Sequence, residues 1–278
     1  MSNVLYSALV IMMPLLFAAG GGLYTELAGV LNIALEGLLL AGAFSAIAVT
    51  YYTGSFAAGI VAAIFVSTIL SALFAFAALK LRSNIFIAGL AVNLLVSGLA
   101  TVLSQHFFGT RGVVALPGFM YLPYIDLYFC AGILLLLFAW IALYRTPFGY
   151  RLRACYKNSE ALVSLGIKPD SYRWAAFLIS GFYCGIGGSF LSLNLGAFVP
   201  NMTAGKGWIA LVVIFLGART PLGILIAAFV FGLAESFSNY AQGIFNVPAD
   251  FILAMPYIVT LLAMILVSVM AKPKDRVL

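Results

Sequence analysis

Long apolar runs dominate this chain and restrict it to very few folds. A helix needs about 20 mostly apolar residues to cross a bilayer, and the sequence has eight runs of roughly that length. They cover residues 4–19, 28–52, 56–79, 85–105, 125–145, 173–195, 221–243 and 249–271. A ninth run, 207–219, is shorter and is compatible with a short helix, a broken helix or a re-entrant segment.

The composition excludes a soluble protein. Only 8% of the 278 residues are charged and 64% are hydrophobic, whereas a soluble domain is about 25% charged. The runs also lack the strict polar–apolar alternation of an outer-membrane barrel. We therefore predict an all-α integral membrane protein, a polytopic bundle of about 8–9 transmembrane helices that forms a single domain over residues 1–278.

The basic residues predict how the bundle is oriented. They gather at four places, namely Lys80 with Arg82, the segment 145–173, Arg219 and the tail 272–276. Cytoplasmic connections are enriched in Lys and Arg, so all four should lie inside the cell, the C-terminus included. The connections 106–124, 196–206 and 244–250 carry few charges and should face outward. The two sets alternate if 207–219 crosses the membrane, and parity then places the N-terminus outside.

A weak internal sequence similarity suggests inverted repeats. Residues 29–35 (GVLNIAL) are similar to residues 205–211 (GKGWIAL), and each segment follows a glycine cluster, 20–22 and 185–188 respectively. The predicted topology gives the two copies opposite orientations. Inverted repeats with glycine-interrupted helices are typical of transporters, whose substrate site lies at the repeat interface.

Polar residues inside the apolar runs are candidates for a solute pathway, because ionisable groups cost about 2.5–3.5 kcal/mol each in the bilayer centre. Asn32 and Glu36 are four residues apart and should share a helical face, and so should Asn93 and Ser97. Such pairs either line a pathway or lock two helices together. Glu235, with Ser236, Ser238 and Asn239, predicts another polar face. Trp208 is a candidate for stacking on a ring or for an interface anchor.

These side chains offer neutral donors and acceptors with few full charges, which suits a neutral polar solute better than an ion. The predicted pathway set is Asn32, Glu36, Asn93, Ser97, Trp208, Glu235 and Asn239.

The segment 146–172 is the only sizeable connection predicted in the cytoplasm. It contains a short amphipathic stretch that Asn158 or Ser159 can cap and Gly166 can end. Leu162 and Leu165 should lie on one face of it. The stretch either rests on the bilayer or docks a cytoplasmic subunit.

The sequence lacks the motifs that ATP hydrolysis and metal binding require. The sequence has no GxxxxGK[ST] phosphate loop, so ATP hydrolysis is not expected in this chain. His106 is the only histidine, and the cysteines show no metal spacing. We predict no catalytic residues, no metal, no cofactor and no nucleic-acid partner.

Four stretches together resemble one family. They are Asn32–Gly37 (NIALEG), Ala91–Asn93 with Gly98, Phe148–Cys155 (FGYRLRAC) followed by Asn158, Ala161 and Gly166-Ile167, and Gly205–Leu211. In order and spacing they resemble permease subunits of bacterial ABC importers for branched-chain amino acids, ribose-type sugars and nucleosides. The nucleoside branch is the most similar, and the resemblance covers about residues 14–245.

The resemblance implies a type II importer-like fold in the inner membrane, paired with a second homologous permease as a heterodimer. It also implies a cytoplasmic ATP-binding cassette ATPase and an extracytoplasmic substrate-binding protein, besides membrane lipids. The loop should then be the coupling region that docks on the ATPase. The coupling residues matched to this sequence are Arg151, Arg153, Asn158, Glu160, Ala161, Leu162, Leu165 and Gly166.

Other hypotheses remain open. The same architecture serves importers of riboflavin, sugars or branched-chain amino acids. A stand-alone carrier driven by protons or sodium, or an intramembrane structural or enzymatic protein, would have a similar composition. Uptake that depends on ATP, on an ion gradient or on neither separates these classes.

Overall fold

The computed structural model describes residues 2–117 and 125–244, which are almost entirely helical. The elements, in chain order, are α1 (Ser2–Leu27), α2 (Leu35–Thr53), α3 (Phe56–Ala75), the π-helical turn η1 (Phe76–Lys80), α4 (Ile85–Phe108), β1 (Val114–Ala115), α5 (Ile125–Arg145), α6 (Pro147–Lys157), α7 (Ser159–Ser164), α8 (Pro169–Leu195), β2 (Ala197–Phe198), α9 (Lys206–Leu216) and α10 (Pro221–Ile244).

Seven of the eight long runs form helices that are long and apolar enough to cross a membrane. This confirms the prediction of a polytopic helical bundle for the part of the chain that the structure describes. The eighth run, 249–271, lies outside the described residues, as do most of the connection 244–250 and the tail 272–276. The ninth run forms α9, whose 11 residues extend about 16 Å, roughly half of the hydrocarbon thickness.

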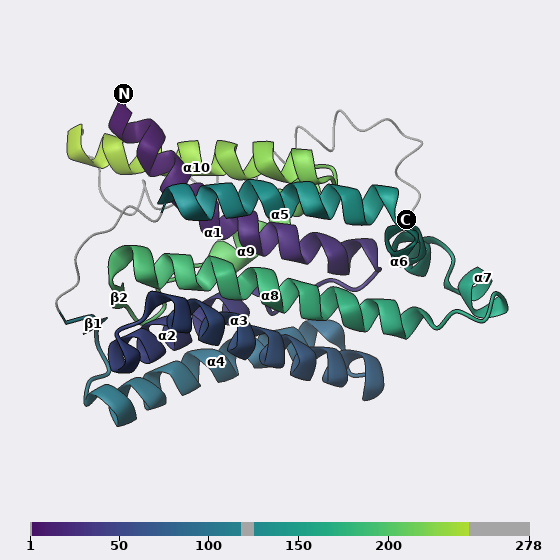
Figure 1. Cartoon of the computed structure of the whole chain (residues 1–278), viewed down its shortest axis with the longest axis horizontal. Coiled ribbons are helices and arrows are strands. Elements are labelled where there is room, and N and C mark those ends of the chain that lie inside the picture. Colours follow the sequence, from purple (N-terminus) through teal and green to yellow (C-terminus); the bar gives the residue numbers. More distant parts are fainter. Residues whose placement is uncertain (1, 118–124, 245–278) are drawn as a thin grey trace.

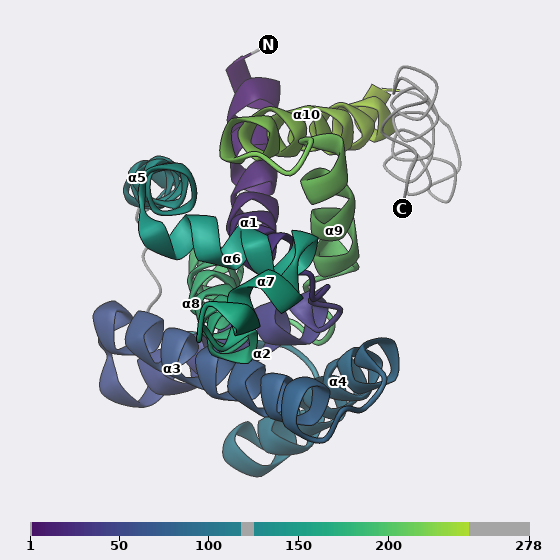
Figure 2. The same ribbon diagram turned by 90° about the vertical axis from the view of Figure 1, so that its right-hand side faces the viewer.

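The long helices lie side by side along the long axis of the molecule (Figure 1). Seen from one end, α1, α8 and α2 occupy the middle, α3 and α4 lie on one side, and α10 lies on the other (Figure 2). In the apolar window of α8 78% of the residues are buried, against 17% in that of α4. The core therefore runs along α1, α2 and α8, and much of α4 faces outward.

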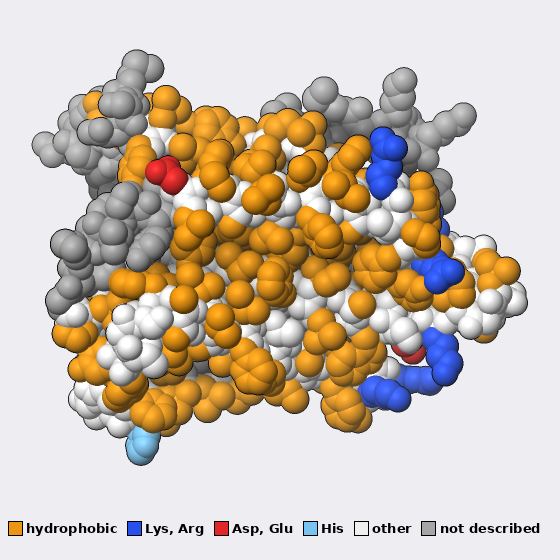
Figure 3. All heavy atoms as spheres, in the orientation of Figure 1, with side chains coloured by type: hydrophobic (Ala, Val, Ile, Leu, Met, Phe, Trp, Pro, Cys, Tyr) orange, Lys and Arg blue, Asp and Glu red, His pale blue; other side chains and the backbone are white. Residues whose placement is uncertain are grey.

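Most of the basic residues of the described part lie at one end of the bundle (Figure 3), and Arg111 and Lys206 are the exceptions. Lys80 and Arg82 line a cavity of about 700 Å³ together with Lys168, and Arg219 pairs with Glu26 at the end of α1. Three of the four predicted basic sites thus share one end. At the opposite end, β1 pairs with β2 in antiparallel register, with Val114 opposite Phe198. This pairing joins the connections 106–124 and 196–206, which are both predicted to face outward.

The glycine clusters do not interrupt helices, contrary to the prediction. Gly20–Gly22 lie inside α1, which is longer than the predicted 4–19, and Gly185–Gly188 lie inside α8. A Cβ on Gly21 would lie 2.7 Å from the Cβ of Tyr183 in α8. The glycines serve close helix packing in this bundle.

The breaks come after these glycines instead. The predicted span 28–52 is wrong at its start, because residues 28–34 are not helical and α2 begins only at Leu35. Similarly, residues 196–205 contain only the short strand β2 before α9 begins. In both places the chain folds back into the bundle from one end without helical structure.

The two re-entering segments have the opposite orientations predicted for an inverted repeat. Gly29 and Gly205 both adopt a positive φ, 79° and 83°. The helix α2 runs toward the end where Tyr52 contacts the C-terminal end of α4. The helix α9 runs the other way, since Arg219 just after it contacts Glu26 at the end of α1. The helices that precede the two segments, α1 and α8, also pack in a similar way: α1 packs on α10, and α8 packs on α3.

Candidate functional site

The starts of α2 and α9 meet head-on in the middle of the bundle. A Cβ added to Gly207 would overlap the backbone nitrogen of Glu36 and lie 2.5 Å from its Cα. Only glycine allows this approach. The contact places two helix N-termini, each with unpaired amide groups and the positive end of a helix dipole, beside one another.

The carboxylate of Glu36 pairs with unpaired amide groups and also offsets the positive ends of the two helix dipoles. It accepts hydrogen bonds from the backbone amides of Gly205 at 2.8 Å and Gly207 at 2.6 Å. A carboxylate at this position neutralises the helix dipoles and satisfies the first amides of α9. Non-helical backbone at membrane depth is tolerated only where such bonds are supplied within the protein.

Two asparagines hold the start of α2 in the same way. Asn93 of α4 accepts a hydrogen bond from the amide of Gly37 at 2.8 Å and donates one to the carbonyl of Ile33 at 3.0 Å. Asn32 accepts a bond from the amide of Ala34 and donates one to Ser180 of α8 at 2.8 Å. Asn32 precedes α2, so the prediction that it shares a helical face with Glu36 is wrong. The break at 28–34 is the reason.

An ion pair continues this line of polar contacts to α10. Lys206 Nζ lies 3.3 Å from Glu235 Oε1, and the side chains are only 14% and 23% exposed. Each charge alone would be costly at membrane depth, and pairing offsets part of that cost. The prediction that Lys206 belongs to an outward connection is wrong, because Lys206 begins α9 and its side chain packs inside the bundle.

The predicted polar face of α10 is divided. Ser236 is buried and donates to the carbonyl of Val4 in α1 at 2.8 Å, while Ser238 bonds within its own helix to Ala234. Glu235 and Asn239 remain on another side of α10, where Asn239 is exposed. Helical periodicity places Ser236 and Ser238 about 160° apart around the axis of α10, so these four residues do not form one face.

The remaining predicted pathway residues differ in exposure. Ser97 is exposed and lines a cavity of about 460 Å³ with Thr101, Gln105 and Arg111. Trp208 is exposed in the first turn of α9, and Asn93 is half-buried. Asn32 is fully buried and bonds to Ser180 of α8, which fits the alternative of a lock between helices. Whether any of them lines a pathway stays a prediction.

The residue that sequence reasoning missed is Lys206. It is the only Lys or Arg between Arg173 and Arg219. Because Glu235 lies in an apolar run and needs a cation, that isolation was a usable signal. Among the described residues, no three His, Cys, Asp or Glu side chains lie together that could hold a metal ion.

The predicted coupling segment forms two helices, α6 and α7, that project from the basic end (Figure 1). Asn158 caps α7 by accepting from the amide of Ala161 at 3.0 Å, and Gly166 follows the helix with a φ of 75°, as predicted. Leu162 is buried but Leu165 is 75% exposed. The prediction of one shared face is wrong, because α7 ends at Ser164 and Leu165 lies beyond its last turn.

The other coupling residues lie on the outside of these helices. Arg151 is exposed and donates to the hydroxyl of Tyr172 at 3.0 Å. Arg153 stacks over Tyr144 and Tyr150 at 4.7 and 5.1 Å from their ring centres. Glu160 and Ala161 are exposed on α7.

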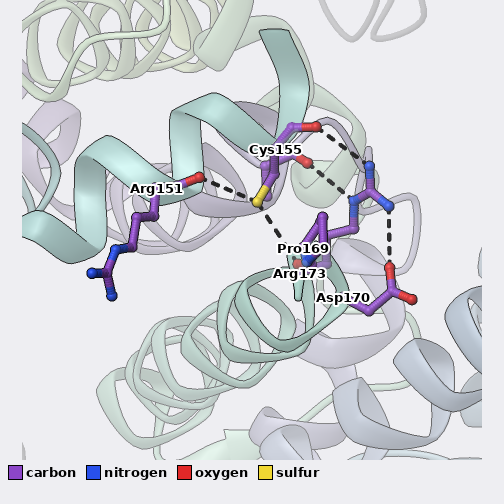
Figure 4. Close-up of polar contacts among 6 residues, drawn as sticks. Arg151, Cys155, Pro169, Asp170 and Arg173 are labelled. Atoms are coloured by element: carbon purple, nitrogen blue, oxygen red, sulfur yellow. Dashed lines mark hydrogen bonds and ion pairs between the residues drawn. The ribbon is translucent and has the colours of Figure 1, made fainter. Parts of the chain in front are cut away.

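A buried cysteine joins α6 to the start of α8. The thiol of Cys155 lies 3.2 Å from the carbonyl of Arg151 and 3.7 Å from that of Pro169 (Figure 4). Burial raises the pKa of the Cys155 thiol above its usual range, and the nearby Arg173 guanidinium opposes that rise. The thiol therefore stays protonated and acts as part of the packing.

Comparison with known proteins identifies the family. Residues 3–268 match the family described as "Branched-chain amino acid transport system / permease component". The chain belongs to this permease family. It is a multi-pass membrane protein and an ABC transporter permease.

Three relatives match this permease over most of its length. The nucleoside ABC transporter permease protein NupC of Lactococcus lactis is 30% identical, and the alignment covers 91% of this chain and 88% of NupC. The guanosine ABC transporter permease protein NupQ of Bacillus subtilis is 29% identical, with 95% and 91% covered. A putative glucose ABC transporter permease protein of Haloferax volcanii, TsgC13, is 32% identical, with 83% and 75% covered.

Solved structures share the fold of this permease. PsaBC from Streptococcus pneumoniae, in complex with a Fab, superposes with a TM-score of 0.58 at 15% identity and covers 99% of this chain and 93% of its own. An inward-facing putative metal-chelate type ABC transporter gives a TM-score of 0.56 at 16% identity, with 92% and 85% covered. At these identities the likeness concerns the fold.

Proposed function

We propose that this permease forms the membrane pathway of an ATP-driven importer for nucleosides in the bacterial inner membrane. The observation that carries the proposal is the meeting of the α2 and α9 starts, held by Glu36. Broken helices that meet near mid-membrane between inverted repeats are where transporters place their substrate sites. The names of the nucleoside and guanosine relatives support the substrate class.

The pathway runs along the face where α4, α2, α9 and α10 follow one another. Within the predicted set, Ser97, Trp208 and Asn239 are exposed on α4, α9 and α10, and Glu235 is partly exposed beside Lys206. Amide, hydroxyl and indole groups offer hydrogen bonds and a stacking surface to a neutral ring-containing solute. Asn32, Glu36 and Asn93 hold the helix starts behind them.

ATP is hydrolysed by a cytoplasmic partner that docks on α6 and α7. Their position at the basic end, which the positive-inside rule assigns to the cytoplasm, supports this docking. Val163 and Leu165 are exposed apolar side chains there. The end that carries β1 and β2 then faces a substrate-binding protein, and the C-terminus lies in the cytoplasm. A second, homologous permease completes a heterodimer.

Reconstitution in proteoliposomes tests the proposal. The chain is co-expressed with its second permease and ATPase, and the loaded substrate-binding protein is added on one side. We expect labelled nucleoside to accumulate only with ATP inside. Uptake by the chain alone, driven by a proton or sodium gradient, would identify a secondary carrier instead.

Binding assays on the substrate-binding protein decide the solute class. Calorimetry with nucleosides, riboflavin, sugars and branched-chain amino acids should show tight binding of nucleosides. Tight binding of another class, with none of nucleosides, would contradict the substrate assignment while leaving the importer architecture intact.

A further inference from the structure

The turn that follows α1 lies where the proposed docking helices meet the interior of the bundle. Its residues, 26–29, end α1 and begin the non-helical segment that leads to α2. The amides of Ala28, Gly29 and Val30 bond back to Tyr24, Glu26 and Thr25, and Gly29 has a φ of 79°. Such a helix end leaves carbonyl groups without a partner in the helix, and these are available to neighbouring elements.

Arg173, near the start of α8, joins this turn to α6. Its Nε lies 3.5 Å from the carbonyl oxygen of Ala28, and its NH2 lies 3.4 Å from that of Cys155 (Figure 4). Its NH1 lies 3.2 Å from the carboxylate of Asp170. One planar guanidinium thus contacts the end of α1, the end of α6 and the first turn of α8, each through a different nitrogen, whereas an ammonium group presents a single nitrogen.

Direct packing connects α6 to the same turn. A Cβ on Gly29 would lie 3.0 Å from Cδ2 of Tyr156 and 3.2 Å from its Cα. The backbone of the turn therefore rests against the last turn of α6. This contact is independent of the hydrogen bonds of Arg173.

A third element reaches the turn from α9. The carboxylate of Glu26 lies 2.9 Å from Nε of Arg219, in the connection between α9 and α10. The Glu26 side chain is almost buried. The turn is therefore connected to both mid-membrane helix starts, to that of α2 through residues 30–34 and to that of α9 through the helix itself.

We propose that the turn 26–29 transmits the movement of α6 and α7 to the helix starts at Glu36 and Gly207, and that Arg173 is the positioning residue that clamps α6 to it. The inference rests on the proposed function. It goes further by assigning the path between docking site and pathway, and a role to Arg173 outside the predicted coupling set.

The test compares four versions of the complete transporter in proteoliposomes: wild type, Arg173→Lys, Arg173→Gln and the matched control Asp170→Asn. The measured quantity is solute taken up per ATP hydrolysed. For both Arg173 variants we expect this ratio to fall about fivefold or more while ATP hydrolysis changes less than about twofold, because each replacement has one donor nitrogen where the guanidinium uses two for the two carbonyls. Asp170→Asn keeps both carbonyl contacts and should retain the wild-type ratio. An unchanged ratio in Arg173→Lys would overturn the inference.

Hydrogen exchange adds a readout that does not depend on uptake. In the wild-type complex, ATP should change the exchange of amides 28–34, and Arg173→Lys should abolish that response. If ATP leaves these amides unaffected in the wild type, the turn is not the transmitting element. A wild-type complex without ATP-dependent uptake would instead contradict the proposed function and the inference with it, so the two failures are distinguishable.

Discussion

Glu36 accepts a 2.6 Å hydrogen bond from the backbone amide of Gly207, a residue 171 positions away in the sequence. The bond joins the start of α2 to the start of α9, two helices that run in opposite directions from the middle of the bundle. One side chain thereby satisfies backbone groups that both lipid and a regular helix would leave unpaired. This pair organises the candidate site.

Glu36→Gln should destabilise the protein. The amide side chain keeps one acceptor oxygen, so one of the two backbone amides loses its partner and both helix dipoles lose a compensating charge. We expect the free energy of unfolding in detergent to fall by about 1–3 kcal/mol. Thermal unfolding followed by tryptophan fluorescence measures it. Glu160→Gln, on the exposed surface of α7, should leave the transition within about 0.5 kcal/mol of wild type.

Gly207→Ala should disrupt the folded bundle more than any other single methyl group at this site. The added Cβ would overlap the backbone of Glu36, and backbone cannot rotate away as a side chain can. A loss of about 2 kcal/mol or more is expected, seen as aggregation during size-exclusion chromatography. Gly98→Ala is the control, because its Cβ would enter open space and alanine favours the helix. Equal behaviour of both variants would refute the close contact.

Lys206 and Glu235 should behave as a coupled pair. Lys206→Met or Glu235→Gln alone leaves a charge with little access to water, so each should lower stability by about 1–3 kcal/mol. The double variant Lys206→Met/Glu235→Gln removes both charges and should be more stable than the sum of the two single changes predicts. A thermal-shift double-mutant cycle measures the coupling. Strict additivity would mean that the two side chains do not interact.

Val163→Asp should weaken the association with the ATPase. The side chain of Val163 is 61% exposed on α7 and makes a better probe than Leu162, which is buried and whose replacement would damage the helix. Even a neutral polar group without a partner in an apolar contact costs about 1–3 kcal/mol, and a carboxylate costs more, so we expect a tenfold or greater loss of co-purifying ATPase. Val113→Asp is matched in exposure, at 57%, but lies at the opposite end. It should co-purify normally, and a similar loss there would contradict docking at α7.

Cys155 should resist alkylation until the pH is well above the usual range of a thiol. Burial favours the neutral form and raises its pKa, and only the thiolate reacts. By linkage, the contribution of this thiol to stability is present at neutral pH and is lost as the pH rises through the raised pKa. Maleimide labelling followed by peptide mass spectrometry, from pH 7 to 10, measures the rate. Rapid labelling of the folded protein at pH 7 would show that the thiol is not buried.

Several site residues were identified from sequence, but their roles were not. Glu36, Asn93 and Glu235 stand out because polar groups are costly in apolar runs. Their spacing suggested shared helical faces, and this failed for Asn32 and Glu36 because an apolar, re-entering backbone segment has the same composition as a helix. Lys206 was misplaced for the same reason. No local pattern marks where an apolar run stops being helical inside the bundle.

The sequence by itself determined that this protein is a bundle of membrane-crossing helices with one basic end, because hydrophobic length and charge asymmetry act on each segment separately. Only the tertiary structure decided that α2 and α9 begin head-on, that Glu36 caps a helix from the other repeat and that Lys206 pairs with Glu235. These contacts join residues far apart in the chain. They exist because buried backbone amides and charges must find partners, and which partners they find depends on how the helices pack.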